Sequence, residues 1–169
     1  LKMLKNYMNL KTNIGIGFDV HRLVRGRKLY LGGLKIKSKL GTLGHSDGDP
    51  VLHSITDAIL GACKMGDIGK LFSDKNKKFK NIRSTFLLRN VIEKIKSDSY
   101  YINNLDVNII AQTPKISKFR KKMIKKIAKL CEINESQINI KGKTTEKLGV
   151  IGKEKAIAAE VIASVIQYD

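Results

Sequence analysis

The chain has 169 residues, 42% of them apolar, and a formal net charge of +18. This length suits one domain with a substantial core, and no apolar run approaches the roughly 20 residues that cross a bilayer, so we expect neither several domains nor a membrane partner. The basic residues are 27 Lys and six Arg. Because Lys recognises phosphates and bases less well than Arg, we expect mainly a solvated Lys-rich surface, with attraction of anions or nucleic acid as the alternative.

The first predicted element is a strand at residues 13–21, where apolar and polar residues alternate. The alternation separates an apolar face from a face of glycines, an acid and a histidine: Ile14, Ile16, Phe18 and Val20 against Gly15, Gly17, Asp19 and His21. The strand therefore presents Asp19 and His21 side by side. Two short strands at residues 29–36 are expected next about a Gly-Gly turn, since glycine accepts the positive φ of tight hairpins.

A helix is predicted from Asp49 to about Cys63, with Asp49 as its N-cap and Pro50 at the first helical position. Its apolar residues form one stripe that should face the core. Asp49, His53 and Asp57 are spaced by four residues and share another face. His53 should therefore point away from the centre of the stripe.

The rest of the chain alternates between helical and strand patterns. Residues 66–78 have two glycines and no periodicity, which is typical of a functional loop, with Phe72 as its anchor. The later elements expected are a helix at about 82–96 (stripe Ile82, Phe86, Val91 and Ile95), a strand at 105–111, a helix at 116–131 with a Lys-rich outer face, a last strand from Ile138, a polar turn at 143–149 and an apolar helix at 156–165.

The three histidines lie in short stretches rich in Asp, and the first 92 residues contain six Asp and no Glu. Catalytic zinc takes three N or O ligands and leaves one position for water or substrate. Asp19, His21 and His53 can supply that set, and Asp57 is placed to accept the other imidazole N–H of His53. His45 competes as a ligand. The alternative is that these histidines are surface or capping groups.

A second polar cluster, Thr144-Thr145-Glu146, offers two hydroxyls and one carboxylate. Oxygen ligands of this kind suit magnesium together with phosphate. On local pattern alone, the simpler interpretation is a capping arrangement before Leu148.

Five blocks stand out in order along the chain: GFDVH at 17–21, HSDGD at 45–49, GDIGKLF at 66–72, AQTPK at 111–115 and TTEKLG at 144–149. Together they resemble the 2-C-methyl-D-erythritol 2,4-cyclodiphosphate synthase family, over about residues 14–166. The resemblance implies an α/β (α+β) fold with a mixed sheet and helices packed on one face. It also implies a homotrimer in which three sheets surround the axis and each active site lies between two subunits.

The implied reaction belongs to non-mevalonate isoprenoid biosynthesis. It converts 4-diphosphocytidyl-2-C-methyl-D-erythritol 2-phosphate, a cytidine diphosphate compound, to 2-C-methyl-D-erythritol 2,4-cyclodiphosphate and CMP. The resemblance implies one zinc ion per subunit on Asp19, His21 and His53, and magnesium or manganese held by Glu146 with the substrate diphosphate. His45, Thr144 and Glu146 would act in catalysis.

The substrate-contacting positions implied by the same resemblance are Asp19, His21, His45, Ser46, Asp67, Gly69, Phe72, Asp74, Asn76, Ala111, Pro114, Lys115, Ile116, Ser117, Lys143, Thr144, Thr145, Glu146 and Lys153. Three residues depart from the family pattern. Lys143 stands where a small or hydroxyl residue is frequent, and Val150 and Lys153 replace a common Phe and Arg at the axial cavity of the trimer.

Two other functions compete with this one. A nucleic-acid-binding module would explain the charge but not the placement of His and Asp. A metal phosphohydrolase would use the same site but release a linear phosphate. We expect one catalytic domain at residues 13–169, preceded by a basic, disordered extension at residues 1–12. The Lys- and Asn-rich composition and basic start favour a plastid-type organelle (an apicoplast or chloroplast stroma) over a bacterial cytoplasm.

Overall fold

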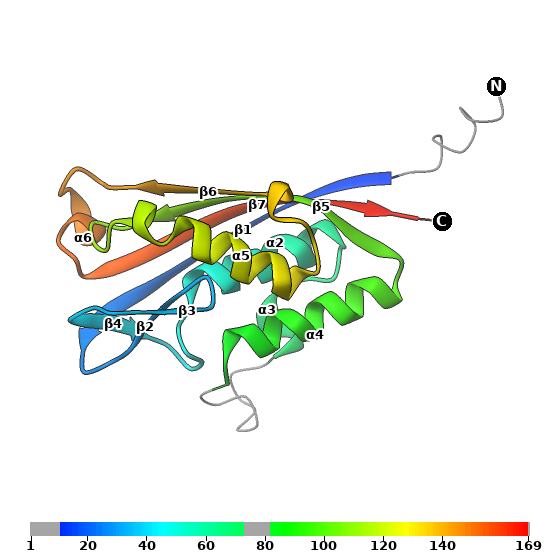
Figure 1. The fold of residues 1–169 in the computed structure, drawn as a ribbon. Helices are drawn as coiled ribbons and strands as arrows, with labels where there is room; N and C mark the ends of the chain where they lie inside the picture. Colours follow the sequence, from blue (N-terminus) through cyan, green and yellow to red (C-terminus); the bar gives the residue numbers. More distant parts are fainter. Residues whose placement is uncertain (1–10, 73–81, 169) are drawn as a thin grey trace.

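The structure is a computed structural model and describes residues 11–72 and 82–168. In these ranges a five-stranded sheet, in the order β4-β1-β7-β5-β6, is covered on one face by helices (Figure 1). β5 and β6 pair in parallel, and the other described pairs of this sheet are antiparallel. The prediction of a mixed sheet with helices packed on one face is therefore confirmed.

The strands of the sheet are β1 (Lys11–Arg25), β4 (Leu40–Leu43), β5 (Tyr100–Ile110), β6 (Ile138–Lys143) and β7 (Ala156–Gln167), and a separate hairpin consists of β2 (Leu29–Leu31) and β3 (Leu34–Ile36). The helices are α2 (Pro50–Ala62), α3 (Ile68–Leu71), α4 (Ser84–Ser97), α5 (Arg120–Cys131) and α6 (Gly149–Gly152), with 3₁₀ turns η2 (Ile116–Lys118) and η3 (Glu135–Gln137). The core lies between the sheet and α2, α4 and α5. Among the described helices, none combines the length and apolarity needed to cross a bilayer.

Two glycines of β1 allow α2 to approach the sheet closely. A Cβ atom on Gly17 would lie 2.0 Å from the carbonyl oxygen of Ser54, and one on Gly15 would meet the helix backbone in the same way. Two strand residues and one helical turn each advance the chain by about 5–7 Å, so the two contacts repeat in step. The next residue on this face of β1 is Asp19, which therefore lies beside the turn of α2 that carries His53.

Replacing Gly17 with Ala is expected to lower the free energy of unfolding by about 3 kcal/mol, because the new methyl group meets helix backbone that has no space to move. Gly61→Ala is the matched control. A Cβ on Gly61 would find its nearest neighbour at 3.9 Å, so this helical substitution should stabilise the protein by roughly 0.5–1 kcal/mol. Urea denaturation of both variants measures the difference. Equal stabilities would contradict the close approach.

Asp49 fixes the start of α2, as the sequence predicts. Its fully buried carboxylate accepts hydrogen bonds from the backbone N–H groups of Val51 and Leu52, both at 3.1 Å. It also accepts from Gly32 and Gly33, at 3.0 and 2.7 Å, in the turn between β2 and β3. Burial raises the pKa of the Asp49 carboxyl, and the amide hydrogen bonds oppose that rise. One side chain thus ties the predicted hairpin to the predicted helix.

The C-terminal element is a strand, so the helix predicted at residues 156–165 is wrong. β7 pairs with β1 on one edge and with β5 on the other, at the centre of the sheet. Its alternate residues face the helices and are fully buried: Ile157, Ala159, Val161, Ala163 and Val165. Four alanines, and β-branched residues spaced by four, fit a buried helix equally well in sequence, but ladders on both edges outweigh that local preference.

The predicted loop at residues 66–78 also needs correction, because it contains the short helix α3. Phe72, its predicted anchor, packs against the core. The later part of this loop lies in residues 73–81, outside the described residues.

Three other features of the fold differ in part from prediction. In α4, Val91 and Ile95 of the expected stripe are buried together with Leu88 and Ile92, whereas Phe86 remains 50% exposed. β6 is not the last strand, since β7 follows it. β1 begins at Lys11, so residues 11 and 12 of the expected extension belong to the sheet, and the rest of that extension lies outside the described residues.

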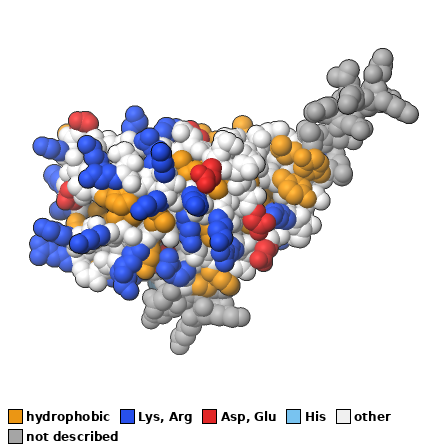
Figure 2. Space-filling view, in the orientation of Figure 1, with side chains coloured by type: hydrophobic (Ala, Val, Ile, Leu, Met, Phe, Trp, Pro, Cys, Tyr) orange, Lys and Arg blue, Asp and Glu red, His pale blue; other side chains and the backbone are white. Residues whose placement is uncertain are grey.

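The surface prediction for α5 is confirmed. Met123, Ile127 and Leu130 are buried, and most lysines of the helix are exposed on its outer side. Figure 2 shows Lys and Arg side chains spread over much of this face, with few acidic side chains between them.

Candidate metal centre and active site

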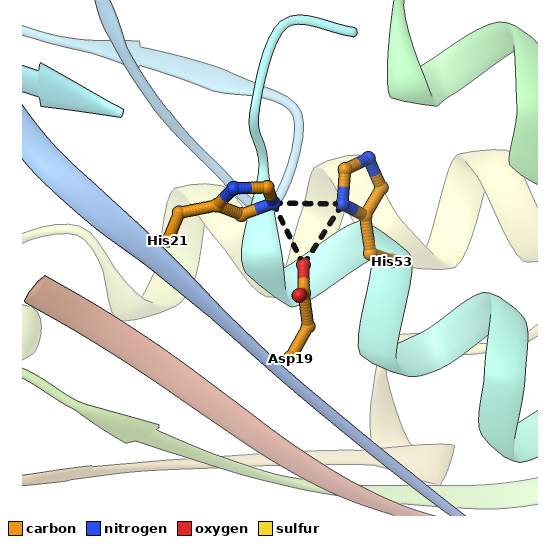
Figure 3. Close-up of side chains that lie close together, drawn as sticks. All are labelled: Asp19, His21 and His53. Atoms are coloured by element: carbon orange, nitrogen blue, oxygen red, sulfur yellow. Dashed lines mark hydrogen bonds and ion pairs between the residues drawn. The ribbon is translucent and has the colours of Figure 1, made fainter. Parts of the chain in front are cut away.

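Asp19, His21 and His53 converge on one point between β1 and α2 (Figure 3). Asp19 Oδ2 lies 2.8 Å from His21 Nε2 and 2.9 Å from His53 Nδ1, and the two histidine nitrogens are 3.1 Å apart. The predicted grouping of these three residues is confirmed, and together they could hold a metal ion. His45 competed for this set in the sequence; it is exposed and does not belong to the cluster.

The three donor atoms suit a small divalent cation. A tetrahedral ion with bonds of about 2.0–2.1 Å places its ligand atoms about 3.3 Å apart. The observed separations of 2.8–3.1 Å are a few tenths of an ångström shorter, so a slight outward movement of the side chains would accommodate the ion. One carboxylate oxygen and two imidazole nitrogens form the N/O donor set typical of catalytic zinc sites.

The polar atoms of Asp19 and His21 that face away from the cluster have hydrogen-bond partners of their own. His21 Nδ1 lies 2.9 Å from the carbonyl oxygen of Leu43, which can only accept a hydrogen bond. The proton of the neutral ring is therefore on Nδ1, and the lone pair of Nε2 faces the cluster. Asp19 Oδ1 accepts a hydrogen bond from the N–H of Val20 at 2.8 Å, which leaves Oδ2 free for the cluster.

The electrostatics of the cluster favour a cation. Burial alone would raise the pKa of Asp19, but the rings of His21 and His53 beside its carboxylate outweigh that effect and hold the pKa well below the usual range. Burial likewise lowers the pKa of His21, and the hydrogen bond and charge of Asp19 reverse this and raise it. An ionised carboxylate beside two imidazole nitrogens is an environment in which positive charge is stabilised.

The predicted role of Asp57 as the partner of His53 is wrong. Asp57 Oδ1 instead accepts a hydrogen bond from the backbone N–H of Ile68 at 2.7 Å and so fixes the entry to α3. The other ring nitrogen of His53, Nε2, lies 2.9 Å from the hydroxyl of Ser46 and 2.8 Å from that of Ser84. Asp57 lies one helical turn from His53 and shares its face, but the Asp57 side chain turns toward the backbone N–H of Ile68.

Sequence reasoning missed Ser84 and the Leu43 carbonyl. Ser84 stands at the start of a predicted helix, and a serine there is ordinarily interpreted as a capping residue. A backbone carbonyl leaves no signal in the sequence. Ser84 lies 38 residues after Ser46, and their hydroxyls are within hydrogen-bonding distance only in the folded protein. No local pattern connects Ser84 with the Asp-rich block at 45–49.

The cluster opens into a pocket of about 390 Å³. Most predicted residues of the first half of the chain line it: Asp19, His21, His45, Ser46, His53, Asp57, Gly69 and Phe72. Ile68, Ile82 and Leu87 add apolar surface to its walls. Asp67 does not line this pocket; its carboxylate accepts a hydrogen bond from Lys70 N at 2.8 Å and caps α3. Asp74 and Asn76 lie outside the described residues.

The predicted residues of the second half of the chain do not line this pocket within the described residues. They lie at the carboxyl ends of β5 and β6 and around α6, at one end of the sheet (Figure 1): Ala111, Pro114, Lys115, Ile116, Ser117, Lys143, Thr144, Thr145, Glu146 and Lys153. Thr144 donates a hydrogen bond to Glu146 at 2.7 Å. Glu146 has φ 50°, a backbone conformation that non-glycine residues rarely adopt and that is enriched at functional sites.

Comparison with known proteins gives consistent results. The model of the YgbB family matches residues 12–166. A bifunctional enzyme IspD/IspF of Pelagibacter ubique is 72% identical over 161 residues, 95% of this chain but 43% of that protein. A 2-C-methyl-D-erythritol 2,4-cyclodiphosphate synthase of Alkaliphilus metalliredigens is 48% identical over 91% of this chain and 97% of its own length. The solved structure of IspF from Plasmodium falciparum in complex with CDP has a TM-score of 0.82 at 44% identity, covering 94% and 97% of the two chains.

These comparisons overturn the predicted plastid-type compartment. The 72% identical relative is bacterial, whereas the Plasmodium structure is 44% identical, so the relatives point to a bacterial protein rather than a plastid one. The Lys- and Asn-rich composition misled the prediction because an A/T-rich genome produces it in either lineage. The chain spans less than half the length of the bifunctional relative.

Proposed function

The chain belongs to the YgbB family, and we propose that it cyclises 4-diphosphocytidyl-2-C-methyl-D-erythritol 2-phosphate to 2-C-methyl-D-erythritol 2,4-cyclodiphosphate with release of CMP. The observation that carries the proposal is the Asp19-His21-His53 cluster at the wall of a 390 Å³ pocket. The names of the relatives, and the CDP bound to the Plasmodium protein, support a cytidine diphosphate substrate.

The reaction requires positioning and charge neutralisation more than acid–base chemistry. An oxygen of the 2-phosphate forms a bond to the β-phosphorus, and the bond between that phosphorus and the bridging oxygen of the diphosphate breaks, so CMP leaves with the electron pair. The attacking oxygen is already anionic, so no protein base has to remove a proton. The Asp19, His21 and His53 side chains would hold zinc, which when bound supplies a positive charge at the β-phosphate.

Residues beyond the three-residue cluster have the chemistry to orient the substrate. His45 and Ser46 line the pocket with a ring nitrogen and a hydroxyl that can donate hydrogen bonds to phosphate oxygens. Glu146, with Thr144, would hold magnesium or manganese against the diphosphate. Ile82 and Leu87 give part of the pocket apolar walls, which would strengthen electrostatic interactions with the phosphates.

We also propose the homotrimer, with each active site between two subunits. The support is an apolar face of the sheet opposite the helices. Ile14, Ile16, Phe18 and Val20 are 72%, 65%, 57% and 48% exposed, and Ile162, which pairs with Ile16, is 47% exposed. Single chains rarely expose so continuous an apolar surface, which usually marks an interface. Within one chain, Glu146 does not line the pocket. A neighbouring subunit would bring its own Thr144 and Glu146 to that pocket.

Incubating the purified chain with the cytidylyl substrate, zinc and magnesium should yield CMP and the cyclic diphosphate in equal amounts. Phosphorus NMR distinguishes the cyclic product from a linear phosphate. A linear product would favour a metal phosphohydrolase, and recovery of unchanged substrate would contradict both activities.

A further inference from the structure

Each of the three cluster side chains has a second hydrogen bond that fixes its orientation. Asp19 is held by the N–H of Val20, and His21 is held by the carbonyl of Leu43. The corresponding atom of His53 is Nε2, and it faces two hydroxyl groups, those of Ser46 and Ser84. The direction of the hydrogen bonds around these hydroxyls determines which of them holds the imidazole.

The proton of the Ser84 hydroxyl is committed elsewhere. Ser84 Oγ makes a short hydrogen bond to Asp47 Oδ1, and a carboxylate can only accept, so the Ser84 proton points at Asp47. The lone pairs of Ser84 Oγ are therefore available to the N–H of His53, 2.8 Å away. Ser84 is 1% exposed, so water does not compete for this contact.

Asp47 is itself held in place by further hydrogen bonds. Its Oδ2 accepts from Arg83 Nε at 2.7 Å, and its Oδ1 also accepts from the backbone N–H of Ser84 at 3.2 Å. The guanidinium of Arg83 lies 4.2 Å from the ring centroid of Tyr30, which fixes the far end of the chain of contacts. The negative charge of Asp47 polarises the Ser84 O–H bond and makes the hydroxyl oxygen a stronger acceptor.

The Ser46 hydroxyl differs from the Ser84 hydroxyl in its exposure and in the partner of its proton. It is partly exposed and lines the pocket, and its oxygen already accepts a hydrogen bond from the N–H of Gly48 at 3.2 Å. Its proton has no carboxylate partner among the described contacts. The Ser46 hydroxyl can therefore rotate toward a ligand in the pocket while Ser84 keeps hold of His53.

We propose that Ser84 is the positioning residue of His53: an Asp47-Ser84-His53 relay fixes the proton on Nε2, so that Nδ1 presents its lone pair to the metal. The proposal rests on the proposed metal centre and adds a buried hydroxyl and carboxylate behind it. The relay also makes the imidazole a better electron donor, since a hydrogen-bond acceptor behind a ligating histidine raises its basicity.

The test is zinc affinity, measured in the absence of substrate by competition with a chromophoric chelator on the full chain. Ser84→Ala is expected to weaken zinc binding by about 10–100-fold, as loss of an outer hydrogen bond typically does. Ser54→Ala is the matched control, because Ser54 is a fully buried serine next to His53 whose hydroxyl donates to the carbonyl of Ala159 at 2.9 Å. Its zinc affinity should stay within about twofold of the parent.

Urea unfolding of both metal-free variants separates positioning from general loss of stability. We expect similar stability losses, with zinc affinity reduced in Ser84→Ala alone. If Ser84→Ala does not fold, Ser84→Cys serves as the second variant, since a thiol of similar size accepts hydrogen bonds weakly and should reduce affinity by at least about threefold. Zinc affinity equal to the parent in either folded variant would overturn the proposal. Because no turnover is measured, this outcome is independent of whether the proposed cyclisation occurs.

Discussion

His21→Ala and His53→Ala are each expected to lose bound zinc and at least about a thousandfold of activity, equivalent to about 4 kcal/mol of transition-state stabilisation. Each substitution removes one of three donor atoms that lie within 3.1 Å of each other. A site left with two ligands keeps too few donors to retain the ion against water. Zinc content by elemental analysis and turnover of the cytidylyl substrate are measured on the same preparations.

His45→Ala is the matched control for this prediction. His45 lines the same pocket but lies outside the cluster, so the variant should keep its zinc and turn over more slowly, because a hydrogen bond to phosphate is lost. Full zinc content in His53→Ala would refute the ligand set. Loss of zinc from His45→Ala would mean that this histidine moves into the site when metal binds.

The parts of the site that could be predicted from sequence are those fixed by local periodicity. Alternation along β1 places Asp19 and His21 on one face, and Asp49 with Pro50 sets the start of α2 and hence the direction of His53. Both patterns depend on neighbouring residues alone. The two elements meet because Gly15 and Gly17 carry no side chains, a feature that the sequence displays but that acquires meaning only once α2 is known to lie on them.

The misassigned C-terminal strand has a different cause. Residues 156–165 are apolar almost throughout, and a central strand shows little of the polar alternation that identifies an edge or surface strand. The choice between helix and strand was decided by partners, β1 and β5, that lie more than 40 residues away in sequence. Local propensity cannot register such partners.

The hydrogen-bond partner of His53 Nε2 is Ser84 and not the predicted Asp57. This difference also arises because the partner lies far away in sequence. Asp57 was predicted because it lies one helical turn from His53, yet the Ile68 amide engages it. Ser84 approaches from another helix, held by Asp47 from the loop before α2. Three segments must fold before this hydrogen bond exists, so no spacing rule could identify it.

Mixing two inactive variants should restore activity if the active site lies between subunits. His53→Ala damages the metal cluster, and Glu146→Gln damages the Thr144-Glu146 cluster just after the carboxyl end of β6. In a randomly assembled trimer, about a quarter of the interfaces combine an intact His53 from one subunit with an intact Glu146 from its neighbour. Co-refolded mixtures should therefore recover roughly a quarter of the activity of the parent protein, starting from two preparations that are each nearly inactive.

His53→Ala mixed with His21→Ala is the control that separates shared sites from general stabilisation. Both substitutions damage the same cluster, so no arrangement of subunits rebuilds an intact one, and this mixture should stay inactive. Native mass spectrometry verifies that mixed assemblies form in each case. If mixed trimers of His53→Ala and Glu146→Gln remain inactive, both clusters of a working site must lie in one chain. If the protein stays monomeric, the proposal that a second subunit covers the apolar face of β1 is wrong.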